Sequence, residues 1–126
     1  MKKTVTSEKA PAALGPYSHG QQFGNLVITS GQLPIDTATG AFPEGIQAQT
    51  KQSLINVQAV LEAAGAKMSD VVKTTVFIKN MNDFGAMNEV YGTFFTSDFP
   101  ARTCVEVARL PKDALVEIEA IAYVEK

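Results

Sequence analysis

Residues 100–124, PARTCVEVARLPKDALVEIEAIAYV, decide the fold. Within this stretch, residues 102–110 and 115–124 alternate in the way that strands do, and a segment containing proline separates them. We therefore predict two closing strands. The only arginines of the chain, Arg102 and Arg109, both fall in the first of them. The second strand has glutamates on one face, and its other face is wholly apolar, with Val116, Ile118, Ala120, Ala122 and Val124.

The composition is typical of a folded protein and argues against two classes of partner. Hydrophobic residues make up 45% of the 126 residues, and charged residues make up 19%. The net charge is −2 and the basic residues are scattered, so the chain offers no surface for tracking phosphates. No segment approaches the roughly 18 apolar residues of a membrane span. We expect a protein that binds neither nucleic acid nor membranes.

The chain has one cysteine, Cys104, and one histidine, His19. A lone cysteine forms no intramolecular disulfide, which favours a reducing compartment such as the cytoplasm. The two residues are also too small a ligand set for a transition-metal site. Covalent catalysis by Cys104 would need His19 to hold its thiolate. We expect neither a metal nor a covalent mechanism, and we interpret His19 as an exposed loop residue.

Changes in hydrophobic period along the chain predict the order βββαβαββ. Helices are predicted over residues 44–64 and from Asn82 or Asp83, either of which can cap the second helix. The predicted strands are residues 3–6, the two arms of a hairpin within 17–31, and residues 70–80, 102–110 and 115–124. Because no linker or repeat interrupts this order, we predict a single α+β domain over residues 1–126.

Local signals mark several ends and faces of these elements. Gly24-Asn25 tolerates the positive φ of a tight hairpin turn, and Gly65 suits the left-handed residue that ends a helix. One predicted face of the strand at 70–80 carries Val72, Thr74, Val76 and Ile78. The apolar stripe of the second helix, which we interpret as core and not as a cofactor site, comprises Phe84, Met87, Tyr91, Phe94 and Phe95.

Two helices can cover only one face of such a sheet. The wholly apolar face of residues 115–124, and the segment 26–28 that is apolar on both faces, therefore suggest that some apolar sheet surface is left uncovered. Large exposed apolar patches are rare on soluble monomers. We expect a homo-oligomer, with clefts between its subunits as candidate sites.

Arg102 is a candidate for binding a small 2-keto or 2-imino acid. Its guanidinium stays charged and can pair a carboxylate through two parallel hydrogen bonds. The alternative is a structural ion pair with Glu106 or with another subunit. Cys104 shares the face of Arg102 in the predicted strand. We interpret Arg109 as part of a surface or interface ion pair.

Glu117 and Glu119 lie two residues apart, so both point to the same side of their strand. They are compatible with the solvent-exposed face of a strand. Alternatively, one of them could be a carboxylate that orients a water and takes its proton. If the last two strands formed a tight hairpin, Arg102 and Glu117 would lie about 13 Å apart at about 3.3 Å per residue. We therefore predict either that these strands are not a hairpin or that the site is completed across a subunit boundary.

The stretch 100–124 closely resembles the C-terminal signature of the RidA (YjgF) family, the reactive-intermediate imine deaminases. APAALGPYSHG at 10–20 and NLVITSGQLP at 25–34 resemble the other two characteristic stretches of that family, in the same order. The resemblance covers essentially the whole chain. It implies a chorismate-mutase-like fold, with a mixed sheet and two helices on one face, assembled into a homotrimer with a barrel-like sheet core.

The resemblance also implies roles for individual residues. Glu117 matches the catalytic acid, and Arg102 matches the group that holds the substrate. The backbone N–H of Cys104 is implied to bind the substrate or its water, and Asn88 to reach the site of a neighbouring subunit. Further substrate-binding positions implied by the resemblance are Tyr17, Ser30 and Gly31.

The implied activity is hydrolysis of 2-enamino and 2-imino acids, such as 2-aminoacrylate, to 2-keto acids and ammonia without a cofactor. Arg102 would hold the carboxylate while Glu117 places a water, so positioning with modest acid–base help would suffice. Two other functions stay open. The chain could be a trimer that binds 2-keto acids without turnover, or an endoribonuclease or translation inhibitor, an activity also attributed to members of the family.

Overall fold

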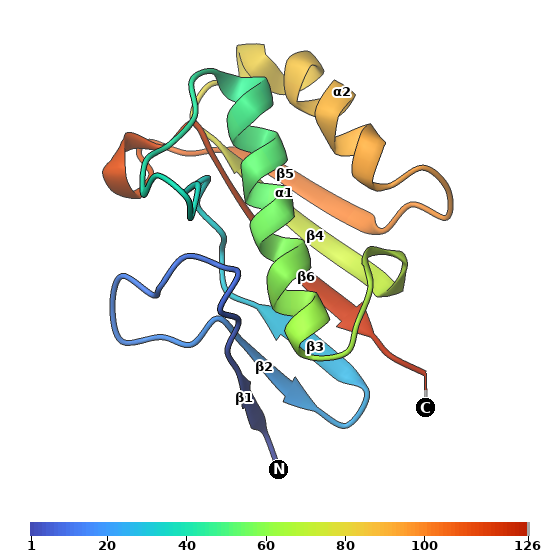
Figure 1. The fold of residues 1–126 in the computed structure, drawn as a ribbon. Helices are drawn as coiled ribbons and strands as arrows, with labels where there is room; N and C mark the ends of the chain where they lie inside the picture. The colour runs from blue at the N-terminus through green and yellow to red at the C-terminus, as the bar shows by residue number, and fades with distance from the viewer. Residues whose placement is uncertain (126) are drawn as a thin grey trace.

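The computed structural model describes residues 1–125, which form strands and helices in the predicted order (Figure 1). The strands are β1 (Lys3–Val5), β2 (Gly20–Phe23), β3 (Leu26–Thr29), β4 (Val71–Ile78), β5 (Ala101–Glu106) and β6 (Val116–Tyr123). The helices are α1 (Ile46–Ala63) and α2 (Phe84–Phe94), and short 3₁₀ turns precede β4, α2 and β6. Within residues 1–125, no helix combines the length and the apolarity that crossing a membrane requires.

All six strands belong to one mixed sheet in the order β1-β2-β3-β6-β4-β5. β6 pairs antiparallel with both β3 and β4, and β5 pairs parallel with β4. The last two strands are therefore not a hairpin, because β4 lies between them. This confirms the first of the two alternatives that the spacing of Arg102 and Glu117 left open, and it makes β5 an edge strand.

The local signals for turns and helix ends are largely confirmed. Gly24 has φ +57° in the two-residue turn between β2 and β3, and Gly65 has φ +81° directly after α1. Asp83 occupies the N-cap position of α2, as one of the two predicted alternatives, but its side chain makes no capping hydrogen bond. The side-chain cap lies one turn earlier, where Asn80 Oδ1 accepts from the Asn82 N–H of the 3₁₀ turn Met81–Asp83.

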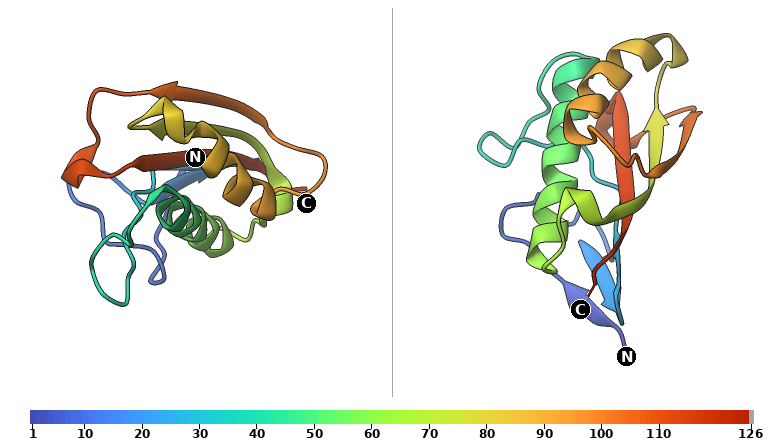
Figure 2. Two further views of the ribbon diagram at one scale, coloured as in Figure 1. Left: turned by 90° about the horizontal axis from the view of Figure 1, so that it is seen from above. Right: turned by 90° about the vertical axis from the view of Figure 1, so that its right-hand side faces the viewer.

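Both helices lie on the same face of the sheet, as Figures 1 and 2 show. The core lies between the two layers and includes Leu54, Val57 and Leu61 of α1 together with Met87 and Tyr91 of α2. The wholly apolar face of β6 belongs to this core, and its buried members, each at most 2% exposed, are Val116, Ile118, Ala120 and Ala122. That face is therefore not the surface left uncovered.

The uncovered face of the sheet is mixed in character. Register places Glu117 and Glu119 of β6 on it, beside the apolar residues Ile28 and Val105, which are 37% and 39% exposed. Because Val27 is fully buried, Ile28 confirms that β3 is apolar on both faces. By the same register Phe77 and Ile121 also lie on this face, so apolar surface for self-association remains, but not on the face of β6 that the sequence pattern suggested.

Two apolar side chains that the sequence pattern groups with buried residues lie at the surface instead. A register shift between Val71 and Lys73 turns Val72 outward, so that it is 48% exposed, and buries Val71 in its place. Phe84, the first residue of α2, is 36% exposed, whereas Met87 and Tyr91 further along the same stripe are buried.

His19 is buried, which contradicts the prediction of an exposed loop residue. Its Nδ1 accepts from the Ser7 N–H at 3.0 Å, so its Nε2 carries the proton that is donated to Pro11 O at 2.8 Å. The ring thereby ties the segment after β1 to the start of β2. It cannot hold a Cys104 thiolate in the same chain, because β2 and β5 are four strand spacings apart, about 19 Å.

Candidate active site

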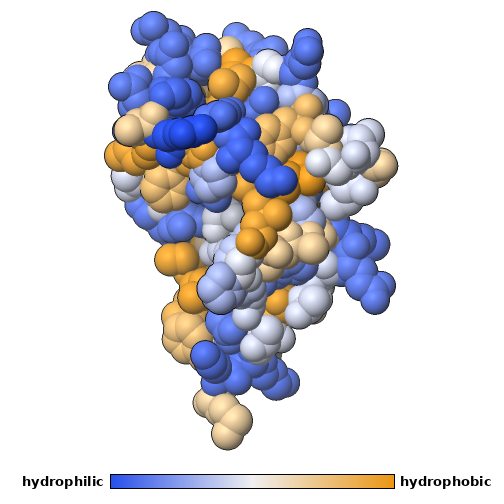
Figure 3. All heavy atoms as spheres, turned by 90° about the vertical axis from the view of Figure 1, so that its left-hand side faces the viewer, coloured by the Kyte–Doolittle hydropathy of each residue, from blue (hydrophilic) through white to orange (hydrophobic). Residues whose placement is uncertain are grey.

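Four of the residues implied by the resemblance line one pocket of about 430 Å³, here called the Glu117 pocket: Tyr17, Ser30, Gly31 and Glu117. Three segments meet there, namely the loop before β2, the exit from β3 and the start of β6. The remaining lining residues are Leu14, Gly15, Pro16, Leu33 and Pro111. Figure 3 shows the side of the molecule on which these loops lie, where apolar side chains interrupt a largely polar surface.

A bulge brings Gly31 against the Glu117 carboxylate. Ile28 pairs with Ile121 and Gln32 with Ile118, so four steps along the chain from 28 to 32 oppose three from 121 to 118. A Cβ built on Gly31 would lie only 2.9 Å from Cδ and Oε2 of Glu117. Any other residue at position 31 would displace the Glu117 carboxylate, so glycine permits this close approach of backbone to carboxylate.

Burial raises the pKa of the Glu117 carboxyl above its usual range, and the neighbouring Glu119 carboxylate raises it further. Within residues 1–125 no basic side chain pairs with Glu117. A carboxylate with a raised pKa binds a proton more readily, which suits a group that must take a proton from water and return it.

Ser30 and Gly31 differ in the hydrogen-bond donors that they leave free for a ligand. The Ser30 N–H donates to His19 O at 2.8 Å and its hydroxyl donates to Ser18 O at 2.5 Å, so both donors are used inside the chain. The Gly31 N–H donates to no other group of residues 1–125. The Gly31 N–H is therefore left for an outside acceptor, and the two bonds of Ser30 hold the segment after β3 in place.

Tyr17 forms one wall of the Glu117 pocket. The residue is 46% exposed, and its hydroxyl accepts from the Leu14 N–H at 3.0 Å. Because that bond folds residues 14–17 into a compact loop, the ring is held at the rim of the pocket.

Arg102 lies apart from this pocket, beneath α2. Its Nη1 donates to Asn88 Oδ1 at 2.7 Å, and its guanidinium carbon lies 5.3 Å from the ring centroid of Phe84 and 4.8 Å from that of Tyr91. Such contacts favour the cation and orient its plane without neutralising its charge. Asn88, Arg102 and the nearby Cys104 are called the Arg102 cluster below. In this chain Asn88 orients Arg102.

The two arginines differ in whether they form an ion pair. Arg109 pairs with Asp113 at 2.8 Å on the surface, which confirms its interpretation as an ion-pair residue. Glu106, the alternative partner of Arg102, instead accepts from the Met81 N–H at 2.8 Å. Among residues 1–125 no carboxylate lies within ion-pair distance of Arg102. Its guanidinium thus keeps donors for an outside anion.

Cys104 offers a main-chain donor and not a thiolate. Burial raises the pKa of its thiol, although the Arg102 guanidinium opposes that shift, so the thiol stays protonated at neutral pH. The Val107 N–H donates to Ile78 O of β4. Because N–H groups alternate in direction along a strand, the Cys104 N–H points away from β4, toward the free edge of the sheet.

The Arg102 cluster and the Glu117 pocket face opposite sides of the sheet. Arg102 pairs with Thr74, whose hydroxyl bonds Tyr91 on the covered face, whereas Glu117 pairs with Phe77. Thr74 and Phe77 are three positions apart, so they point in opposite directions. Two strand spacings and three steps along the strand separate the two backbones by about 14 Å. One chain does not bring both groups to one small molecule.

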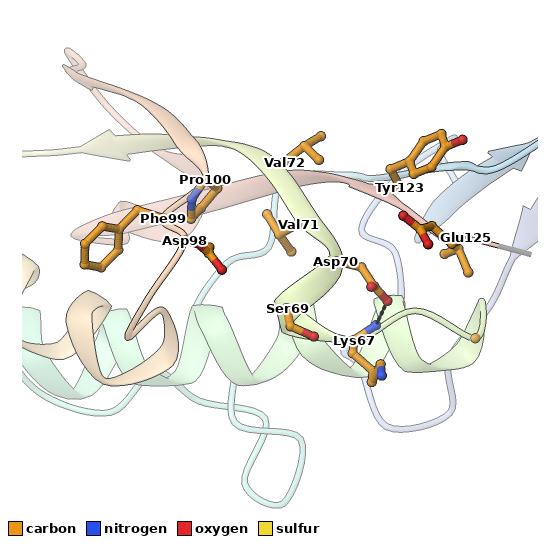
Figure 4. Close-up of a pocket in the computed structure, with 12 residues that line it drawn as sticks. Lys67, Ser69, Asp70, Val71, Val72, Asp98, Phe99, Pro100, Tyr123 and Glu125 are labelled. Carbon is orange, nitrogen blue, oxygen red and sulfur yellow. Dashed lines mark hydrogen bonds between the residues drawn. The ribbon is translucent and has the colours of Figure 1, made fainter.

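A larger pocket of about 760 Å³ lies at the other end of β6 and contains none of these residues (Figure 4). Figure 4 shows Val72, Phe99 and Tyr123 around it, and Asp70, which accepts from the Lys67 N–H at 2.9 Å. The smaller pocket holds the Glu117 carboxyl, whose pKa is raised by burial, so we place the candidate site there. Residues 1–125 contain no group of three or more His, Cys, Asp or Glu side chains able to hold a metal.

The family described as Endoribonuclease L-PSP matches residues 7–124. The chain belongs to this family. The 2-iminobutanoate/2-iminopropanoate deaminase of Salmonella typhimurium is 59% identical over 125 residues, covering 97% of this chain and 98% of that protein. The match confirms the resemblance to RidA (YjgF) proteins.

Solved structures in the family share the fold. The crystal structure of the YjgF gene product from Escherichia coli has 56% sequence identity and a TM-score of 0.95, and the match covers 98% of this chain and 99% of that one. Escherichia coli TdcF with bound serine has 48% identity and a TM-score of 0.94, with the same coverage of 98% and 99%.

Sequence reasoning missed residues in both groups. Leu33 and Pro111 wall the Glu117 pocket, and nothing in their local pattern distinguishes them from ordinary loop residues. Phe84 and Tyr91 were interpreted only as core. Their spacing of seven residues places both rings on one face of α2, and this signal could have indicated a cation site.

Proposed function

We propose that this chain hydrolyses 2-imino acids to 2-keto acids and ammonia, in a site where the Arg102 cluster of one subunit meets the Glu117 pocket of a neighbour. The assembly we propose is a homotrimer with a barrel-like sheet core. The observation that carries the proposal is the placement of two groups on opposite faces of one sheet: a guanidinium that has no carboxylate partner among residues 1–125, and a carboxyl with a raised pKa. A second copy can supply the missing half.

Each group in this site has one task. Arg102 pairs the substrate carboxylate, and the N–H groups of Cys104 and Gly31 are further donors. A water beside Glu117 attacks C2 of the imine, and Glu117 takes its proton as the C–O bond forms. Glu117 returns that proton to the nitrogen, so C2 carries a hydroxyl and an amino group. As the C–N bond then breaks, the hydroxyl proton passes to the departing nitrogen, the C–O bond becomes the carbonyl, and ammonia leaves. Imino acid and water give keto acid and ammonia, so the atoms balance without an oxidant.

The deaminase name of the Salmonella typhimurium relative supports the choice of substrate. The family's description as endoribonuclease has less support here, because a net charge of −2 provides no basic stripe for RNA. A trimer that binds 2-keto acids without turnover would use the same Arg102. A cytoplasmic location stays a prediction that rests on the lone Cys104.

The test generates the imine in place with a serine or threonine dehydratase and follows its decay with and without the protein. We expect the intact protein to accelerate the decay. In Arg102→Ala this acceleration should be about 10- to 100-fold smaller, since hydrogen bonds to charged groups contribute about 1.5–3 kcal/mol. Arg102→Lys keeps the charge but loses the planar fork, so its activity should lie between that of the intact protein and that of Arg102→Ala.

Unchanged decay with the intact protein would overturn the enzyme proposal. A binding trimer would instead be indicated if Arg102→Ala lost binding of a 2-keto acid while Glu117→Ala had no effect on imine decay. Cys104→Ala serves as the control, because a main-chain donor survives that substitution.

A further inference from the structure

Helix α1 buries two side-chain amides, those of Gln49 and Asn56, which are 7% and 0% exposed. Seven residues separate them, so they lie on one face of the helix, about 10.5 Å apart along its axis. Glutamine and asparagine are mostly surface residues, and burial requires partners for their polar atoms. The partners of these two amides lie in the segments that lead to the Glu117 pocket.

Asn56 holds the segment that leaves β3. Its Nδ2 donates to Leu33 O and to Ile35 O, both at 3.0 Å, and its Oδ1 accepts from Gln52 Nε2 at 3.0 Å. Leu33 lies two residues beyond Gly31. In the part of the chain that the structure describes, the isolated bridge at Gln32 is the one β-pairing that joins this segment to β6 after the bulge at Gly31. Asn56 therefore supplies anchors that the sheet ladder does not.

Gln49 holds the approach to β6. Its Oε1 accepts from the Leu115 N–H at 2.9 Å, and its Nε2 donates to Pro43 O at 3.1 Å. Leu115 lies two residues before Glu117. One rigid helix thus contacts the backbone close to both Gly31 and Glu117.

We propose that Gln49 and Asn56 are positioning residues for imine deamination, with Gln49 setting the place of the Glu117 carboxylate and Asn56 the place of the Gly31 N–H. This inference rests on the proposed function. Gly31 and Glu117 are already in close contact, so a small shift of either backbone changes their geometry. Misplacement by about 1 Å can reduce a rate by about 10²-fold.

The two amides act on different steps, which separates positioning from general support of the fold. Gln49→Met removes the acceptor next to Glu117, and we expect kcat to fall at least about tenfold with little change in KM. Asn56→Leu frees the segment that presents the Gly31 N–H to the substrate carboxylate, and we expect KM to rise at least about tenfold. Gln49→Glu keeps an acceptor for the Leu115 N–H and should recover most of the lost kcat.

Ser53→Ala is the matched control. Ser53 is fully buried on the same helix, and its hydroxyl has no partner within residues 1–125, so its loss should leave kcat and KM unchanged. Should Asn56→Leu not fold, Asn56→Ser, whose side chain is too short to reach both carbonyls, should give the same rise in KM. Melting temperatures of all variants establish that kinetics are compared on folded protein.

Kinetics of Gln49→Met and Asn56→Leu equal to those of the intact protein, with only the melting temperature lowered, would overturn the positioning role. If both variants lost kcat and raised KM in parallel, the assignment of Gln49 to the Glu117 carboxylate and of Asn56 to the Gly31 N–H would be overturned as well. Intact protein and Arg102→Ala are measured alongside. If the intact protein does not accelerate imine decay, both proposals fall, whereas activity lost only in Arg102→Ala overturns the positioning role alone.

Discussion

Glu117 lies where burial and the Glu119 carboxylate both disfavour its charged form, which places its pKa above the usual value of about 4.3. A base must be ionised to act, so kcat/KM should rise with pH through this raised pKa. Glu119→Gln removes the like charge and should move the acidic limb to lower pH. The measurement is kcat/KM from about pH 4 to 8, with uncatalysed decay subtracted at each pH. A limb that does not move would contradict the proposed role of Glu119.

The same pKa shift predicts a pH-dependent stability with a definite sign. Because folding raises the pKa, the contribution of Glu117 to the free energy of unfolding is fully present below its unfolded pKa and is lost as pH rises through its folded pKa. Glu117→Gln carries no charge, so it should gain stability relative to the intact protein between about pH 4 and 7. Urea titrations of both proteins at about pH 4 and about pH 7 test this. A difference in the free energy of unfolding between them that does not change with pH would refute it.

At the scale of the element, α1 buries hydroxyls without partners. The Thr50 hydroxyl, in a fully buried residue, has no hydrogen-bond partner among residues 1–125. An unsatisfied buried polar group costs about 1–3 kcal/mol, and valine has the shape of threonine without the hydroxyl. Thr50→Val should therefore raise the free energy of unfolding by about 1 kcal/mol in urea titration. Thr50→Ser, which keeps the hydroxyl and loses a methyl, should lower it. A destabilised Thr50→Val would indicate that the hydroxyl is satisfied in solution.

At the scale of the whole molecule, a site shared between subunits predicts recovery of activity in hybrids. Arg102→Ala and Glu117→Gln are each expected to keep only a small fraction of the activity when assembled alone. After denaturation and refolding of an equal mixture, every hybrid trimer would contain one site with both groups intact. Three quarters of trimers would be hybrids, so about a quarter of the sites should be active. No recovery above either variant alone would place both groups in one chain and refute the shared site.

Local pattern was enough to predict the elements, because the signals involved act within a few residues. The turn at Gly24, the end of α1 at Gly65 and the alternation in β6 each follow from backbone sterics or side-chain period. The charged fork of Arg102 and the paired glutamates of β6 were likewise visible as candidates, since residue type alone determines what chemistry they offer.

Contacts between distant segments decided the rest. Alternation shows that β6 has a buried face but not which element covers it, and the insertion of β6 between β3 and β4 depends on pairing across the whole chain. The burial of His19, the outward turn of Val72 and the approach of Gly31 to Glu117 arise from tertiary packing or from bulges that no local period records. By itself, the sequence determined the order of elements and the chemical groups; only the tertiary structure decided that Arg102 and Glu117 face opposite ways, because strand order and register are set by long-range pairing.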